Sequence, residues 1–263
     1  MKGRILVVGA ALALLACSKR PACRGEISHD DLVRLQARAA KGDEQVCREL
    51  LRATIKVDDE GVVLNGARIH TILDAKAKQN VPALRELLQK DRETWKAIYP
   101  GRDFVAPVDL EVPAVMEVGP GVSVASTLAS TGYRQLNVHS GDLTMKLDYW
   151  VRSPPDADPR ELVHVEVDGV TGSFLVRFGG ETTARTGHRH DARDRDAAAK
   201  AIASEWSSTT RDLPRGLVLR IPKGSFHDAL ALARSFLALP ELAGATVAFE
   251  IGEPSRGAGA PRD

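Results

Sequence analysis

The chain has 263 residues with a formal net charge of +1 at pH 7, and 43% of its residues are hydrophobic. The near-neutral charge argues against a nucleic-acid-binding surface or an electrostatic membrane patch. The hydrophobic fraction suffices for packed cores, and the length suits two small domains or one large one.

Residues 1–17 have the pattern of an export signal. Lys2 and Arg4 precede the apolar run 5–15, and Ala16 stands just before Cys17. At 1.5 Å per residue this run is too short to cross a hydrocarbon core of roughly 30 Å, so it predicts a signal peptide rather than a membrane-spanning helix. Its ending, residues 14–17, resembles the lipobox of bacterial lipoproteins.

The lipobox resemblance implies removal of residues 1–16 and acylation of Cys17, with fatty acids such as palmitate anchoring the protein durably in a membrane. Cleavage leaves 34 basic and 35 acidic residues. Ser18 follows the cysteine, which in this family favours the periplasmic face of the outer membrane. The alternative is an ordinary signal peptide with a chance cysteine.

Two further cysteines, Cys23 and Cys47, bear on the redox chemistry of the exported chain. An oxidising compartment permits a disulfide between them. A free Cys47 packed as a small apolar residue is the alternative. A metal site is disfavoured because no C-x-x-C pair exists.

The first half of the chain reads as a tether with a helical segment over 17–53, followed by an α+β domain over 54–152. The hairpin 54–64 ends at Asn65-Gly66, and alternating residues make 143–151 the clearest half-buried strand. The remaining predicted elements of this domain are a helix from Pro82 to about Ile98, a strand over 105–112, a helix over 122–131 and a strand over 136–138.

A linker, 153–160, leads to a second domain over 161–253, and a disordered tail, 254–263, follows. The charged run 185–196 reads as a solvated loop. The predicted elements of the second domain are strands over 163–167 and 174–178, a helix over 198–206, a strand over 217–221, a helix over 226–239 and a strand over 245–251.

The two domains repeat one plan. The segment 108–113 aligns with 217–222, and each is followed by a helix and another strand. We predict an internal duplication and an α+β fold. Each of the two similar domains is expected to be a mixed sheet of four to five strands with two helices on one face. Two unrelated α+β stretches are the alternative.

The repeated unit resembles the periplasmic domain of the ExbD/TolR family of biopolymer-transport proteins. The hairpin signature 62–66, the strand 108–112 and the helical stretch 122–133 carry the resemblance. It implies the fold, dimer-like pairing and binding of protein partners or peptidoglycan. The family's membrane-spanning helix with its aspartate has no counterpart here, so proton transport is not implied.

The sequence lacks the common catalytic motifs, which favours a protein that is not an enzyme. The chain lacks a Gly-x-Ser-x-Gly elbow, an H-E-x-x-H helix, a Walker loop and a dinucleotide fingerprint. Plain structural interpretations are favoured for the three candidate runs: a loop at 119–121, a turn at 139–142 and a solvated segment at 188–191. We therefore expect no cofactor, no metal and no turnover.

The predicted function is binding of an envelope protein or the cell wall, through a sheet edge or the groove between the domains. The candidate edge is 143–151, with Thr144, Lys146 and Asp148 facing outward. These charges equally suit protection of an edge from aggregation. A solute-binding lipoprotein of a transporter is the alternative function, and an enzyme with a dispersed site is the remote one.

Overall fold

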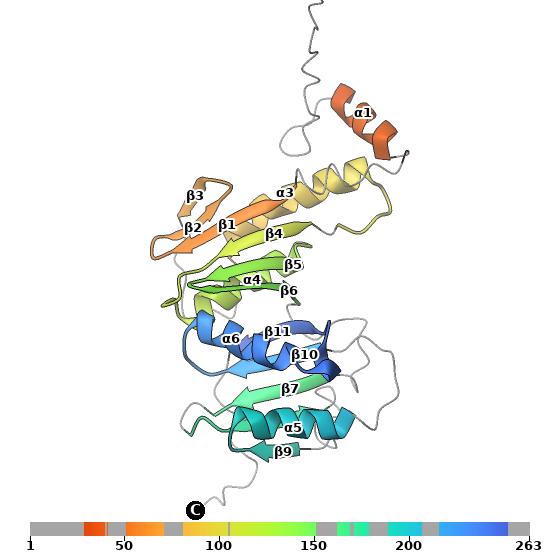
Figure 1. Cartoon of the computed structure of the whole chain (residues 1–263). Coiled ribbons are helices and arrows are strands. Elements are labelled where there is room, and N and C mark those ends of the chain that lie inside the picture. Colours follow the sequence, from red (N-terminus) through yellow and green to blue (C-terminus); the bar gives the residue numbers. More distant parts are fainter. Residues whose placement is uncertain are drawn as a thin grey trace, which may run out of the picture.

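The computed structural model describes residues 29–39, 41, 51–70, 81–104, 106–150, 162–168, 171–178, 189–206 and 216–251. Within them the fold is α+β, as the sequence predicts, with two mixed sheets and helices packed on each (Figure 1). The signal peptide, the three cysteines, the linker and the C-terminal tail lie outside the described residues.

The first unit is a sheet in the order β3-β2-β1-β4-β5-β6, with two helices. Its parallel centre of β1, β4 and β5 is flanked by antiparallel strands. The bounds are β1 Ala53–Asp58, β2 Gly61–Leu64, β3 Ala67–His70, β4 Pro107–Glu111, β5 Gln135–Ser140, β6 Leu143–Asp148, α3 Pro82–Ile98 and α4 Val118–Ser130.

The second unit repeats this topology without a counterpart of β6. Its order, β11-β10-β7-β8-β9, matches β5-β4-β1-β2-β3 strand for strand, with β7, β10 and β11 parallel. The bounds are β7 Leu162–Val167, β8 Phe174–Phe178, β9 Arg189–Ala192, β10 Gly216–Ile221, β11 Thr246–Ile251, α5 Arg195–Trp206, α6 Phe226–Leu237 and the 3-10 helix η2 Pro240–Leu242.

The pairing registers support the sequence alignment of the two units. Val108 lies opposite Ala53, and its aligned residue Leu217 lies opposite Val163. Counting along the strands makes the pair Lys56–Glu111 equivalent to the pair Glu166–Arg220. The same rung of both sheets is thus a charge pair, with the signs exchanged between the strands.

Two strands were missed in the sequence, and they occupy equivalent outer positions. Asn65 and Gly66, with φ of 51° and 85°, form the two-residue turn that connects β2 to β3. Positive φ at both residues is typical of the hairpin turn that Asn-Gly favours. The counterpart of β3 in the second unit is β9. It lies inside the charged run 185–196, which we predicted to be a solvated loop, so that prediction was wrong for residues 189–192.

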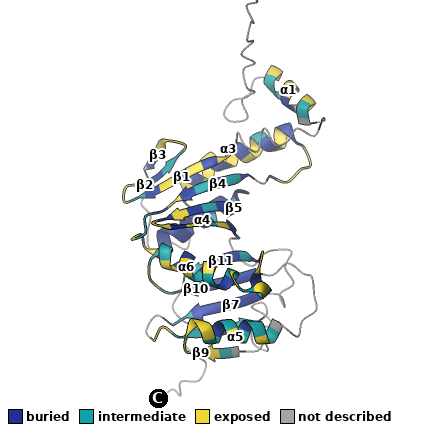
Figure 2. Cartoon of the chain, viewed as in Figure 1, coloured by how far each residue is buried: buried dark blue, intermediate teal, exposed yellow. Residues whose placement is uncertain are grey.

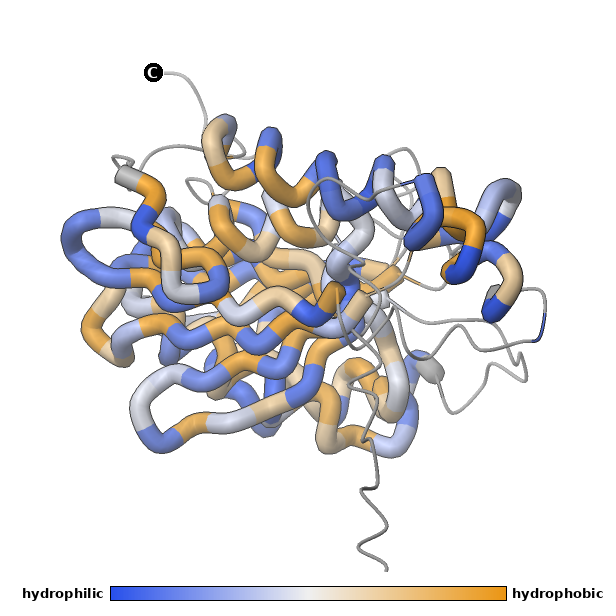
Figure 3. The backbone as a smooth tube through the Cα atoms, turned by 90° about the horizontal axis from the view of Figure 1, so that it is seen from above, coloured by the Kyte–Doolittle hydropathy of each residue, from blue (hydrophilic) through white to orange (hydrophobic). Residues whose placement is uncertain are grey.

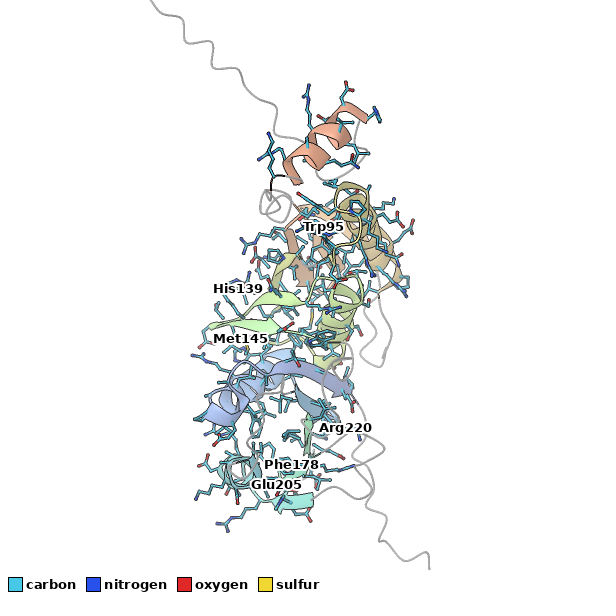
Figure 4. All side chains as sticks on the ribbon, turned by 90° about the vertical axis from the view of Figure 1, so that its right-hand side faces the viewer. Trp95, His139, Met145, Phe178, Glu205 and Arg220 are labelled. Carbon is cyan, nitrogen blue, oxygen red and sulfur yellow. The ribbon has the colours of Figure 1, made fainter. Side chains whose placement is uncertain are left out.

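The helices cover opposite sides of the two sheets. Figure 1 shows α3 and α4 behind the first sheet and α5 and α6 in front of the second, and in the side view of Figure 4 the two pairs of helices lie to the right and to the left of the sheets. Side chains alternate between the two faces of the strands, as in the burial of β1, and hydropathy alternates likewise in Figure 3. The N-terminal helix α1, His29–Ala39, packs on α3, where its Leu35 is buried and Gln36 Nε2 donates to the Ala97 carbonyl at 3.0 Å.

The central helix α4 is buried on nearly all sides (Figure 2). It begins at Val118 rather than at residue 122, because residues 119–121 form its first turn instead of the predicted loop. A proline is tolerated there because the first-turn N–H groups have no intrahelical partner. A helix without a charged side chain is expected to be enclosed by protein on all faces, and α4 contacts α3 of its own unit as well as α6 and β11 of the second.

Candidate functional site

The predicted partner-binding residues lie where the alternation places them. Thr144, Lys146 and Asp148 are exposed on β6, whereas Leu143, Leu147 and Tyr149 are buried. Burial raises the pKa of Asp148, and the nearby Arg134 partly offsets the effect. The face assignment of the strand is therefore confirmed by its burial pattern.

The edge of β6 is partly occupied by the second unit. Both α6 and β11 contact this strand. At its end, Tyr149 forms a parallel bridge with Val247, and the Trp150 N–H donates to the Val247 carbonyl at 2.9 Å. This edge of the first sheet thus faces the second unit, where the prediction placed an edge open to a partner.

Tyr149 anchors this contact. Its ring centroid lies 5.7 Å from that of Phe249 in β11, and its hydroxyl is 3.3 Å from Ser126 Oγ in α4. Its N–H donates to the Arg134 carbonyl at 2.9 Å. The burial of the phenol raises the pKa of Tyr149 to about 12, because an ionised oxygen has little solvation there.

The starts of α4 and α6 exchange hydrogen bonds. The Val118 N–H donates to the Gly224 carbonyl and the Phe226 N–H donates to the Met116 carbonyl, each at 2.9 Å. Helix starts leave such N–H groups without intrahelical partners. The first helical N–H group of each unit's helix therefore finds its acceptor in the other unit, and the two hydrogen bonds are related by a local two-fold axis.

Side-chain packing fills the space between the units at this junction. Gly121 of α4 faces Phe226, whose ring centroid lies 5.9 Å from that of Phe249. The helix α4 also contacts β11, just as α6 contacts β6. We use the name junction for the contacts among Gly121, Tyr149, Phe226 and Phe249 together with the hydrogen bonds exchanged at the starts of α4 and α6.

One histidine of the second unit reaches the first. His227 Nδ1 lies 2.8 Å from the Ser140 carbonyl oxygen, and its Nε2 lies 3.9 Å from Asp142 Oδ1. The predicted turn at 139–142 is present as the end of β5 and the tight turn into β6. Ser140 Oγ is buried without a hydrogen-bond partner, so this run does not present a reactive hydroxyl to solvent.

Charged ladders cross the sheet faces that lack helices. In the second sheet Glu166 Oε2 lies 2.6 Å from Arg177 and 3.7 Å from Arg220, which in turn lies 2.7 Å from Glu250. Figure 4 shows Arg220 on the side of the sheet opposite α5 and α6. In the first sheet the equivalent pair Lys56–Glu111, at 2.8 Å, is far more exposed.

The outer edges of the two sheets are β3 and β9. No described strand lies beyond either of them. The β3 edge carries Arg68, which pairs with Asp58 at 2.7 Å and with Glu60 at 3.2 Å. On β9, the His190 ring packs edge-on against Phe178, with centroids 5.9 Å apart.

A metal-binding cluster and a membrane-spanning helix are both absent from the described residues. Among them, no group of three or more His, Cys, Asp or Glu is placed to hold a metal ion. His188 of the candidate run 188–191 lies outside them. No helix in the part of the chain that the structure describes is both long and apolar enough to cross a membrane.

The junction is the feature that sequence reasoning missed. Its signal in the sequence is the stretch 118–130, which carries no charge and holds two glycines around a proline directly after Val118. Comparison with known proteins adds no identification: no protein-family model matches the chain, and no curated protein matches it either.

Proposed function

We propose that this chain is an exported lipoprotein, anchored through Cys17, that binds an envelope protein or the cell wall without chemical turnover. Its two units act as a dimer-like pair within one chain, as an accessory to a transport system of the ExbD/TolR type. The sequence pattern of residues 1–17 supports the anchor, and the repeated topology supports the pairing.

The observation that carries the proposal is the arrangement of the sheet edges. The inner strands β6 and β11 contact each other, and the outer strands β3 and β9 have no described strand beyond them. An unpaired strand offers backbone N–H and C=O groups to an extended segment of a partner. We therefore propose that the partner binds at the outer edges β3 and β9. The site predicted from the sequence, Thr144, Lys146 and Asp148 on β6, serves as the comparison in the experiment below.

Proline substitutions at consecutive residues test whether a partner binds at these edges. The measurement is how much of the partner the delipidated protein and its variants capture from envelope extracts. Ala67→Pro and Arg68→Pro form one pair in β3, and His190→Pro and Asp191→Pro form the other in β9. Successive N–H groups point to opposite sides of a strand, so one member of each pair removes an outward donor and the other a ladder bond.

The expected result is loss of capture by one folded variant of a pair, with circular dichroism unchanged. Thr144→Pro in β6 is the comparison variant. If capture is lost only in this variant, the partner binds at Thr144, Lys146 and Asp148, as the sequence predicts, and not at the outer edges. Full capture by all folded edge variants contradicts binding through a sheet edge.

The solute-binding alternative needs a cleft between the two units. At the described junction that position is filled by Gly121, Tyr149, Phe226 and Phe249 in direct contact. This packing favours partner binding on the outside of the pair over enclosure of a solute within it.

A further inference from the structure

The turn between β5 and β6 and the first turn of α6 meet at a second contact between the units. Gly141, with φ of 59°, shapes the turn, and a Cβ on it would lie 3.0 Å from the Ala114 Cβ and 3.7 Å from His227 Nδ1. The left-handed conformation suits glycine, and the tight space leaves little room for a side chain. The Ser140 carbonyl and Asp142 consequently stand on either side of the turn, both within reach of His227.

The hydrogen bond to Ser140 defines the proton positions on the imidazole. A carbonyl oxygen only accepts, so at 2.8 Å His227 Nδ1 must carry the hydrogen. In the neutral ring Nε2 is then a bare acceptor. It faces Asp142 Oδ1 at 3.9 Å, where two acceptors have no attraction for each other.

A second proton reverses this relationship. It places an N–H on Nε2 and a positive charge on the ring as a whole, so that the Asp142 carboxylate becomes an ion-pair partner. We infer that His227 is a proton-controlled clasp, binding only Ser140 when neutral and both Ser140 and Asp142 when protonated. The clasp joins the first unit to the second beside the junction.

Other charged groups lie on the elements around His227. His227 stands in the first turn of α6, at the positive end of the helix dipole. Asp228 lies on the same turn, and its carboxylate accepts a hydrogen bond from Ser225 Oγ at 2.7 Å. The other titratable groups on the described elements that meet here are His139, Lys146 and Asp148 of β5 and β6, Arg234 of α6, and Glu117 and Lys223 in the segments before α4 and α6. His139 bonds Thr144 at 3.1 Å, and the backbone of Glu117 is bridged to that of Ser225.

The clasp predicts a pH-dependent coupling between the two units. Histidine changes charge between about pH 5 and 8, whereas aspartates in general remain ionised at about pH 5.5. Because Asp142 is almost fully exposed, the expected gain is that of a surface ion pair, about 1.5- to 5-fold in the unfolding equilibrium constant.

The test is a double-mutant cycle on the full chain with His227→Gln, Asp142→Asn and the double variant, by urea unfolding at about pH 5.5 and about pH 8. Glutamine keeps an N–H donor for Ser140 but cannot take up a proton. His29→Gln on the exposed face of α1 is the matched control, and its cycle with Asp142→Asn is expected to show no coupling at either pH.

The proposal predicts coupling between His227 and Asp142 at the lower pH, its loss at the higher pH and its loss in roughly 1 M NaCl. Asp142→Asn alone is expected to remove the extra stability that the ion pair gives at the lower pH, by the same amount as the coupling. This variant keeps the test decisive if His227→Gln fails to fold. Equal coupling at both pH values, or none at the lower one, overturns the clasp.

Discussion

Gly121 of α4 and Phe226 of α6 approach so closely that no side chain fits between them. A Cβ built on Gly121 would lie 2.4 Å from Phe226 Cγ and 2.5 Å from Cδ2. This contact between one glycine and one ring is the tightest point of the junction that the glycine positions reveal.

Gly121→Ala is expected to destabilise the protein by about 1–3 kcal/mol or more, because the ring and the start of α6 must shift. In a helix free of this contact the same change stabilises by up to about 1 kcal/mol, so the sign of the effect is informative. Urea unfolding measures it. In a Phe226→Ala background the penalty is expected to disappear, and a penalty that persists there contradicts the contact.

Tyr149→Phe is expected to make the fold less sensitive to alkali. The folded protein holds the Tyr149 proton up to about pH 12, whereas an unfolded tyrosine releases it near pH 10. The unfolded state therefore loses the proton first, and stability falls as the pH rises from about 10 towards about 12, by roughly 2–3 kcal/mol in total.

The phenylalanine variant keeps the packing against Phe249 and lacks this titration, at a cost of about 1 kcal/mol near neutral pH for the lost hydroxyl contacts. Unfolding curves between about pH 8 and 11 compare the two proteins. An identical alkaline loss in both contradicts the assignment to Tyr149.

Glu166→Gln and Glu111→Gln compare equivalent charged rungs in the two sheets. The Glu166 side chain is 8% exposed and interacts with two arginines, whereas Glu111 and Lys56 are 58% and 55% exposed. Loss of the Glu166 charge is expected to cost about 1–3 kcal/mol, and loss of the Glu111 charge less than about 1 kcal/mol. Denaturant unfolding in low and high salt checks both, and equal costs contradict the role of burial.

Cys17→Ser is expected to yield an unprocessed or soluble protein, because acylation at this residue is the proposed anchor. Membrane fractionation and metabolic labelling with palmitate measure the outcome. Retention in the membrane together with normal labelling of the variant contradicts the lipoprotein proposal.

Local patterns in the sequence predicted those parts of the fold that depend on local burial. Alternation placed Leu143, Leu147 and Tyr149 inward, and the aligned segments 108–113 and 217–222 indicated two similar units. The predicted elements do not include β3 although Asn65-Gly66 is a strong hairpin signal, because the prediction ends the hairpin 54–64 at this dipeptide, whereas in the structure it forms the centre of a second hairpin.

Contacts between distant segments account for the rest. Nothing near Gly121 in the sequence indicates that Phe226 packs against it, and nothing near Ser140 indicates His227. Likewise, the charged residues of β9 give no hydrophobic alternation, because an outer strand buries little of its surface. These features depend on how the two units dock, which periodicity within one segment does not encode.

The exchanged bonds at Val118 and Phe226 also set an order of events for a chain that is synthesised from its N-terminus. The first residue of α4 finds its acceptor at Gly224, roughly a hundred residues further along the chain, and contacts of such long sequence separation form slowly. Until that segment arrives, the uncharged helix α4 has no second unit to cover it. Emergence of α6 and β11 is therefore the moment at which α4 becomes covered by the second unit, and a chaperone that shields α4 during this interval has a defined period in which to act.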